Sequence, residues 1–104
     1  MRNSDYIKML SSIFDKIIEI TTVKANDYAS SGDTLKNFKV VGSRINIKAS
    51  EVAWFFITVK LARLENLKDK PPMAESVEDT IIDLINYIGL YQACRLEEES
   101  TNGY

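Results

Sequence analysis

A four-residue period in the last third of the chain does most to limit how the protein can fold. The residues that recur with this period are Glu75, Asp79, Asp83 and Tyr87. Four residues turn an α-helix by only about 40° beyond a full turn, so the period predicts a helix with all four along one stripe. We call the three carboxylates of this set the acidic stripe. Carboxylates at i, i+4 repel one another, so the stripe requires a cation or basic side chains beside it.

The size and composition of the chain predict one soluble domain. Its 104 residues include 45% hydrophobic and 27% charged side chains, as in ordinary globular proteins. The net charge of −2 gives no general reason to bind nucleic acid or an acidic membrane. A single cysteine excludes an internal disulfide and suits a reducing compartment. No apolar run reaches about 18 residues and no signal peptide is evident, so a cytoplasmic protein is expected.

The absence of histidine narrows the chemistry further. It excludes serine–histidine and cysteine–histidine catalysis, imidazole bases and histidine-bound zinc. Any metal ion would be held by oxygen ligands, which favour Mg²⁺ or Mn²⁺.

Periodic apolar residues and turn signals predict an all-α fold of three long helices and one short helix. The expected long helices run from residue 5 to the region of 24–28, from 50 to about 67, and from 76 to 95. The short helix is expected over 34–41, and a polar tail from about 97 is expected to fray. Asp33 and Ser50 are expected to cap the short helix and the helix that follows it. Such helices are expected to form a bundle, which chains of this size often complete by oligomerising.

The helix from residue 50 is expected to be the central one. Its segment 52–59 is nearly all apolar, which predicts burial on most sides. Glu51 falls in its first turn, where the helix dipole favours an acid. Lys60 and Arg63 share one edge of its second half.

Two interpretations of the acidic stripe stay open from the residues alone. In the first, Glu75, Asp79 and Asp83 hold one or two Mg²⁺ ions. In the second, Asp79 only caps its helix together with Ser76, and Asp83 only pairs with a basic side chain of the central helix.

The basic residues and the loop residues can likewise be interpreted either as ligand-binding or as structural. Lys60 and Arg63 either bind phosphate or form salt bridges with the acidic stripe. The segments 24–28 and 33–38 are rich in lysine, asparagine, aspartate and aromatic residues. They either contact a base, a sugar and phosphates, or serve as helix caps and core lids.

Four motifs, in order, resemble the small, often phage-encoded nucleotide-modification-associated domain family. They are K-x-x-D-Y from Lys24, D-x-x-x-N-F from Asp33, K-x-x-R-L-x-x-L from Lys60, and E-S-x-x-D-T-x-x-D-x-x-N-Y from Glu75. The resemblance covers about residues 20 to 90, and the last motif is its most specific part. This family is similar to the all-α, MazG-like nucleoside triphosphate pyrophosphatases.

The resemblance implies a four-helix, oligomeric fold and a Mg²⁺-dependent hydrolase acting in phage nucleotide metabolism. The expected reaction cleaves a nucleoside triphosphate into a monophosphate and pyrophosphate. The expected metal ligands and catalytic carboxylates are Glu75, Asp79 and Asp83, with Glu51 as a fourth ligand. The residues expected to bind the nucleotide are Lys24, Asp27, Asn37, Lys60, Arg63, Asn86 and Tyr87.

The chain departs from the family pattern at several positions. Ala29 stands where the family has glycine, Ala25 where it has asparagine, and Val59 where it has an acid. The E-x-x-E signature of the MazG-like enzymes is not visible on the central helix. The alternative hypothesis is therefore a non-catalytic protein that sequesters a nucleotide signal. A third is an interaction protein whose acidic stripe is fully paired.

Overall fold

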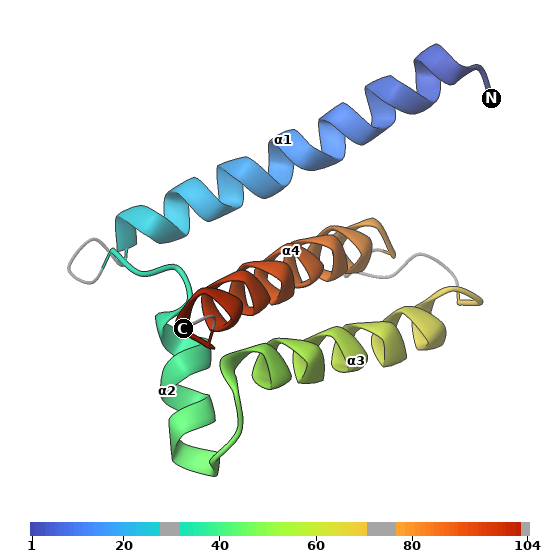
Figure 1. Ribbon diagram of the computed structural model, residues 1–104. Helices are drawn as coiled ribbons and strands as arrows, with labels where there is room; N and C mark the ends of the chain where they lie inside the picture. The colour runs from blue at the N-terminus through green and yellow to red at the C-terminus, as the bar shows by residue number, and fades with distance from the viewer. Residues whose placement is uncertain (28–31, 71–76, 103–104) are drawn as a thin grey trace. The chain divides into compact units, whose positions relative to one another are not determined.

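The fold consists of α-helices throughout the part of the chain that can be described. The computed structural model describes residues 1–27, 32–70 and 77–102, and the side chains of 24–27 and 101–102 are outside that description. Its helices are α1 (Asn3–Asp27), α2 (Lys36–Ile45), α3 (Ala49–Leu67) and α4 (Val77–Asn102) (Figure 1). No strand occurs among the described residues. The predicted all-α class, with three long helices and one short one, is confirmed.

The chain divides into two compact units, Met1–Gly32 and Asp33–Tyr104. The first unit contains α1, which begins at Asn3, two residues earlier than expected. Its exposed apolar side chains include Tyr6, Phe14 and Ile18. No helix in the described ranges is long and apolar enough to cross a membrane.

In the second unit α3 packs against both α4 and α2. α3 and α4 run side by side in opposite directions, and α2 lies across the end where α3 begins (Figure 1). Their buried core cluster holds Leu35, Phe38, Val52, Ala53 and Cys94. Cys94 is a free cysteine and packs in this cluster as a small apolar side chain.

α2 lies later in the chain than the turn signals predicted. It ends at Ile45, so Gly42 and Arg44, which were expected in a loop, are helical. Asp33 does not cap the helix directly. Its Oδ1 accepts a hydrogen bond of 2.9 Å from the Leu35 N–H and holds the turn before α2. After Ile45 the chain leaves the helix at the C-cap residue Asn46, which has a left-handed φ of 61° that asparagine tolerates.

Contacts between helices also change the predicted ends of α3 and α4. α3 begins at Ala49, so Ser50 lies in its first turn, and the Ser50 hydroxyl donates to Glu98 at 2.8 Å. α4 continues to Asn102, through the segment that was expected to fray. Glu97 contacts Lys39, and Glu99 pairs with Arg95 one turn before it. These tertiary and i, i+4 contacts extend the helix beyond its apolar period.

Within the unit Asp33–Tyr104, the prediction that residues 52–59 are buried on most sides is only partly met. Val52, Ala53 and Ile57 are buried. Trp54 and Phe55 remain 54% and 60% exposed. α2 and α4 cover one side of α3, and apolar composition alone could not say which side would be covered.

Gly42 marks a close approach that leads to a prediction. A Cβ at this position would lie 2.6 Å from the backbone oxygen of Ile47, whose N–H donates to the Gly42 carbonyl at 2.9 Å. We expect Gly42→Ala to lower the free energy of unfolding by about 1–3 kcal/mol, because backbone must move. Gly89 in α4 has nothing within 4 Å of its Cβ position, so Gly89→Ala should stabilise by about 0.8 kcal/mol. Urea denaturation measures both, and a stabilising Gly42→Ala would contradict the prediction.

Candidate functional site

The central feature of the candidate site is an ion pair between α3 and α4. Lys60 Nζ lies 3.0 Å from Oδ2 of Asp83. The side chains are 21% and 44% exposed, so the pair is open to solvent on the side of Asp83. The expectation that a basic residue of the central helix faces the acidic stripe is confirmed by this contact.

One helical turn away from the Lys60–Asp83 pair, α3 and α4 also contact each other through two stacked aromatic rings. Phe56 precedes Lys60 by four residues, and Tyr87 follows Asp83 by four. Their rings are stacked at 5.3 Å with an interplanar angle of 11°. Phe38 of α2 meets both rings edge-on, at 6.1 Å and 6.4 Å. Tyr87, expected to line a nucleotide pocket, therefore packs its ring among aromatic neighbours at the edge of the core.

Arg63 and Asp79 lie in the opposite direction from this stack. Arg63 is three residues beyond Lys60 on α3, and Asp79 is four residues before Asp83 on α4. Both are exposed. Because the two helices are antiparallel, the next turn of α3 and the preceding turn of α4 lie at the same level. One surface thus alternates cationic and anionic groups over about two helical turns.

The remaining predicted site residues are distributed more widely. Glu75 and Ser76 lie outside the described residues, as do the side chains of Lys24 and Asp27 at the end of α1. Asn37 is exposed on α2, and Asn86 is half-buried on α4.

Glu51 lies apart from the Lys60–Asp83 pair. It is nine residues before Lys60 on the same helix, which is about 14 Å along the axis. Its carboxylate accepts a hydrogen bond of 3.3 Å from the Lys48 N–H at the start of α3. The structure assigns it a helix-capping contact and does not bring it to Asp83.

The donor set of the candidate site can be tested against a divalent cation. Asp79 and Asp83 offer carboxylate oxygens one turn apart, which is the ligand type that Mg²⁺ prefers. Among the described residues, no three acidic or cysteine side chains are grouped closely enough to hold a metal ion. Asp79 and Asp83 alone are fewer ligands than such a group, and Glu75, the third expected ligand, lies outside the described residues.

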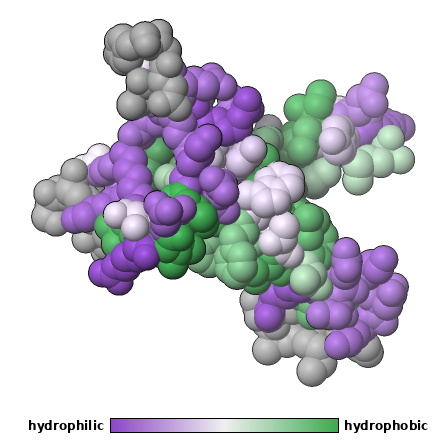
Figure 2. Space-filling model, turned by 60° about the horizontal axis from the view of Figure 1, so that its bottom comes forward, coloured by the Kyte–Doolittle hydropathy of each residue, from purple (hydrophilic) through white to green (hydrophobic). Residues whose placement is uncertain are grey.

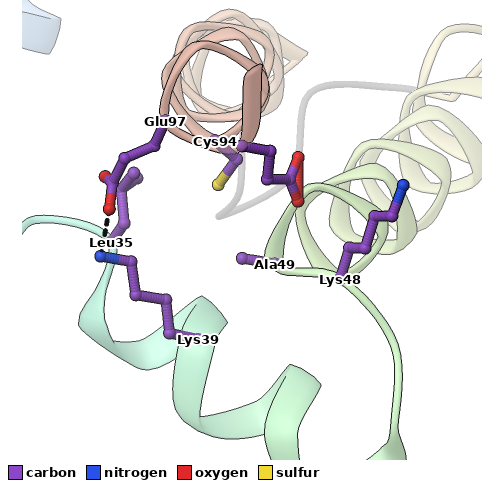
Figure 3. A pocket seen from close by; sticks show the side chains of 7 residues that line it. Leu35, Lys39, Lys48, Ala49, Cys94 and Glu97 are labelled. Atoms are coloured by element: carbon purple, nitrogen blue, oxygen red, sulfur yellow. Dashed lines mark hydrogen bonds and ion pairs between the residues drawn. The ribbon is translucent and has the colours of Figure 1, made fainter. Parts of the chain in front are cut away.

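A second polar region surrounds a hollow of about 410 Å³ where α2, α3 and α4 meet. Figure 3 shows Lys39 of α2 reaching Glu97 of α4 across its mouth, with Cys94 beside it. Lys39 Nζ also lies 2.8 Å from Oδ2 of Asp33. Glu98, on its other side, accepts hydrogen bonds from the Ser50 N–H and hydroxyl. These contacts join the three helices at one end.

The electrostatics of this region follow from its contacts. The hydrogen bond from Lys39, helped by that from the Leu35 N–H, holds the pKa of Asp33 below its usual 3.8. The same bond, with a second to Glu97, raises the pKa of Lys39. Burial, followed by the charges of Glu98 and Glu97, raises the pKa of the Cys94 thiol. Cys94 is therefore held as a neutral thiol, which makes it a poor nucleophile.

The lowered pKa of Asp33 predicts a pH-dependent stability. The contribution of its ion pair is present above about pH 3.8 and is lost as the pH falls through the lower folded-state pKa. We expect Asp33→Asn to lower the urea midpoint at pH 7, and the gap from the unmodified protein to narrow by pH 3. Asp69→Asn, in the exposed turn after α3, is the matched control. An unchanged gap between pH 7 and pH 3 would contradict the prediction.

Several contacts of the candidate site were not predicted from the sequence. Phe56 was expected only as a core residue, although its i, i+4 spacing to Lys60 places it on the same face. The salt bridge from Lys39 to Glu97 joins residues 58 positions apart, and no local pattern signals it.

Comparisons of the chain with protein-family models, with curated proteins and with solved structures find no match. The resemblance noted for the four motifs therefore stays an interpretation of the residues, and the geometry of α3 and α4 has to support any function by itself.

Proposed function

We propose that the protein binds the phosphates of a nucleoside triphosphate at the α3–α4 surface and hydrolyses it to a monophosphate and pyrophosphate with Mg²⁺. The observation that carries the proposal is the solvent-open Lys60–Asp83 pair between two helices. An ion pair of this kind can separate when an anionic ligand takes the lysine and a cation takes the aspartate. A pair closed inside the core would lack that option.

In this proposal the basic and acidic residues have separate roles. Lys60 provides a point charge for phosphate, and Arg63 provides a planar donor pair that suits two phosphate oxygens. Asp79 and Asp83, with Glu75, hold Mg²⁺. Mg²⁺ bound there neutralises phosphate charge and makes a bound water more acidic. The protein acts in the cytoplasm as a homo-oligomer, in phage nucleotide metabolism.

The same proposal includes residues that contact the base and the sugar of the nucleotide. Asn86 and Tyr87 follow Asp83 on α4, and Asn37 is exposed on α2. We propose that these three side chains of the second unit contact the nucleotide.

Incubation with each nucleoside triphosphate and Mg²⁺ tests the activity directly. We expect pyrophosphate and the matching monophosphate as products, and no product when Mg²⁺ is removed with a chelator. Lys60→Met should lose the activity, whereas Lys16→Met on α1 should keep it. If no triphosphate yields pyrophosphate at high protein concentration, the catalytic proposal fails.

A second candidate is a non-catalytic protein that sequesters a nucleotide. Asp83 already has a cationic partner in Lys60, and the described residues provide only part of a metal ligand set. Both observations favour binding without cleavage. Isothermal titration with nucleotides in a chelator distinguishes the two. Tight binding without metal and recovery of intact nucleotide support sequestration, and recovery of hydrolysed nucleotide excludes it.

A further inference from the structure

We infer that the last turns of α4, residues 95–102, form a latch that unwinds and closes again while the core of the second unit stays folded. Polar contacts hold the latch, so salt weakens it, and its opening gives solvent access to Cys94. All the contacts concerned lie within the unit Asp33–Tyr104. The inference does not depend on the proposed function.

The apolar packing of α4 ends at Cys94. This residue belongs to the buried core cluster and is 1% exposed. None of the side chains of residues 95–100 is buried within the described structure, and Leu96, the one apolar residue in that range, is 56% exposed. The hydrophobic effect therefore contributes little to holding this end of the helix. A helical segment of this length is marginal in water without tertiary contacts.

Two polar contacts tie the latch to the other helices. On one side the Glu97 carboxylate pairs with Lys39 of α2. On the other side the Glu98 carboxylate accepts hydrogen bonds of 3.2 Å and 2.8 Å from the N–H and the hydroxyl of Ser50 in α3. The side chains of Lys39 and Glu97 are 43% and 50% exposed, and ion pairs this open are weak and are screened by salt. The latch therefore opens at a smaller free-energy cost than the core.

A hollow of about 410 Å³ lies beside these contacts, and Leu35, Ala49 and Cys94 form its apolar lining. Figure 3 shows the sulfur of Cys94 pointing into the hollow, with the contact between Lys39 and Glu97 across one side. Figure 2 shows apolar areas enclosed by hydrophilic surface on the left, where α2 and the C-terminal end lie in Figure 1. Release of the latch removes the charged rim of the hollow and uncovers the thiol.

The charges around Cys94 distinguish an open latch from a thiol that reacts in the closed form. Burial raises the pKa of the Cys94 thiol most, and the charge of Lys39 acts in the opposite direction. Removing Lys39 therefore leaves less thiolate and slows any reaction of the closed form. The same change releases Glu97 and speeds a reaction that proceeds through the open form. The two mechanisms predict opposite results.

Alkylation by iodoacetamide measures the opening, because Cys94 is the only cysteine in the chain. The thiolate sulfur displaces iodide and forms a thioether, and mass spectrometry follows the added mass. We expect the rate to exceed the rate allowed by global unfolding, which urea denaturation provides, at least about tenfold. Sodium chloride at about 1 M should raise the rate about two- to threefold further. A rate equal to the global-unfolding value and independent of salt overturns the inference.

Two variants locate the contacts of the latch. Lys39→Met should raise the alkylation rate about two- to fivefold. Ser50→Ala keeps the net charge, removes one hydrogen bond to Glu98 and should raise the rate at least about twofold. Lys68→Met is the matched control, because it removes the same charge at the other end of α3. Each rate is corrected for the global stability of the variant. A Lys39→Met protein that reacts as slowly as the unmodified chain, or more slowly, overturns the inference.

Hydrogen exchange followed by mass spectrometry tests the opening without any reaction at the thiol. We expect the backbone amides of residues 97–102 to exchange together, and faster in Lys39→Met, whereas those of residues 52–57 keep their rates. Simple fraying of a helix end predicts instead a rate that rises steadily toward residue 102 and does not depend on Lys39. Exchange of the last turns that is unchanged by Lys39→Met overturns the inference.

Discussion

Asp83→Asn is expected to lower pyrophosphate release at least about a hundredfold while leaving the fold nearly unchanged. The substitution keeps the size of the side chain but removes the charge that we propose to hold Mg²⁺. Because Asp83 is 44% exposed, losing its ion pair with Lys60 should cost at most about 1 kcal/mol of stability. Measuring pyrophosphate release and urea denaturation on the same preparation separates the two effects.

Asp69→Asn is the matched control for this variant. It removes the same charge from the exposed turn after α3 and should leave the release rate unchanged. A folded Asp83→Asn protein with full activity would show that Asp83 takes no part in the reaction. An Asp83→Asn protein that unfolds would favour the hypothesis of an interaction protein, in which the acidic stripe is paired and stabilises the fold.

Phe38→Ala is expected to produce the largest loss of stability, about 3–4 kcal/mol. Phe38 is buried and is the only part of α2 that contacts both members of the Phe56–Tyr87 stack through its ring. Removing it leaves a cavity and separates α2 from the helices that carry the candidate site. Chemical denaturation followed by circular dichroism measures the change.

Two further variants make this prediction specific. Phe38→Leu keeps most of the apolar volume and should lose less than half as much stability. Val40→Ala, on the exposed side of α2, should change the free energy of unfolding by about 0.5 kcal/mol or less. Equal losses for Phe38→Ala and Val40→Ala would show that α2 does not depend on the aromatic cluster.

The sequence predicted the helices well because their signals are local. The periodic apolar residues and the turn signals between them were enough to predict four helices. The ends of α2 and α4 were less well predicted. Ser50 and Glu98 are 48 residues apart, so no local pattern could signal the contact that joins the start of α3 to the last turns of α4.

The candidate site was predicted in part, because some of its residues follow local patterns along single helices. Periodicity placed Asp83 on one stripe and Lys60 on one edge, and charge complementarity made their contact an expectation that the structure confirms. Tyr87 shared the stripe, but its ring stacks on Phe56. A residue at the right period can turn into the core or toward a ligand, and spacing along one helix does not distinguish the two.

The sequence by itself determined which faces of the helices are apolar, acidic or basic, because those patterns repeat within single turns. Only the tertiary structure decided which apolar faces are covered. The segment 52–59 is apolar nearly all round, yet α2 and α4 bury Val52, Ala53 and Ile57 and leave Trp54 and Phe55 exposed. The hydrophobic effect favours burial of any apolar side but does not select the partner. That choice depends on the few directions from which two other helices can pack.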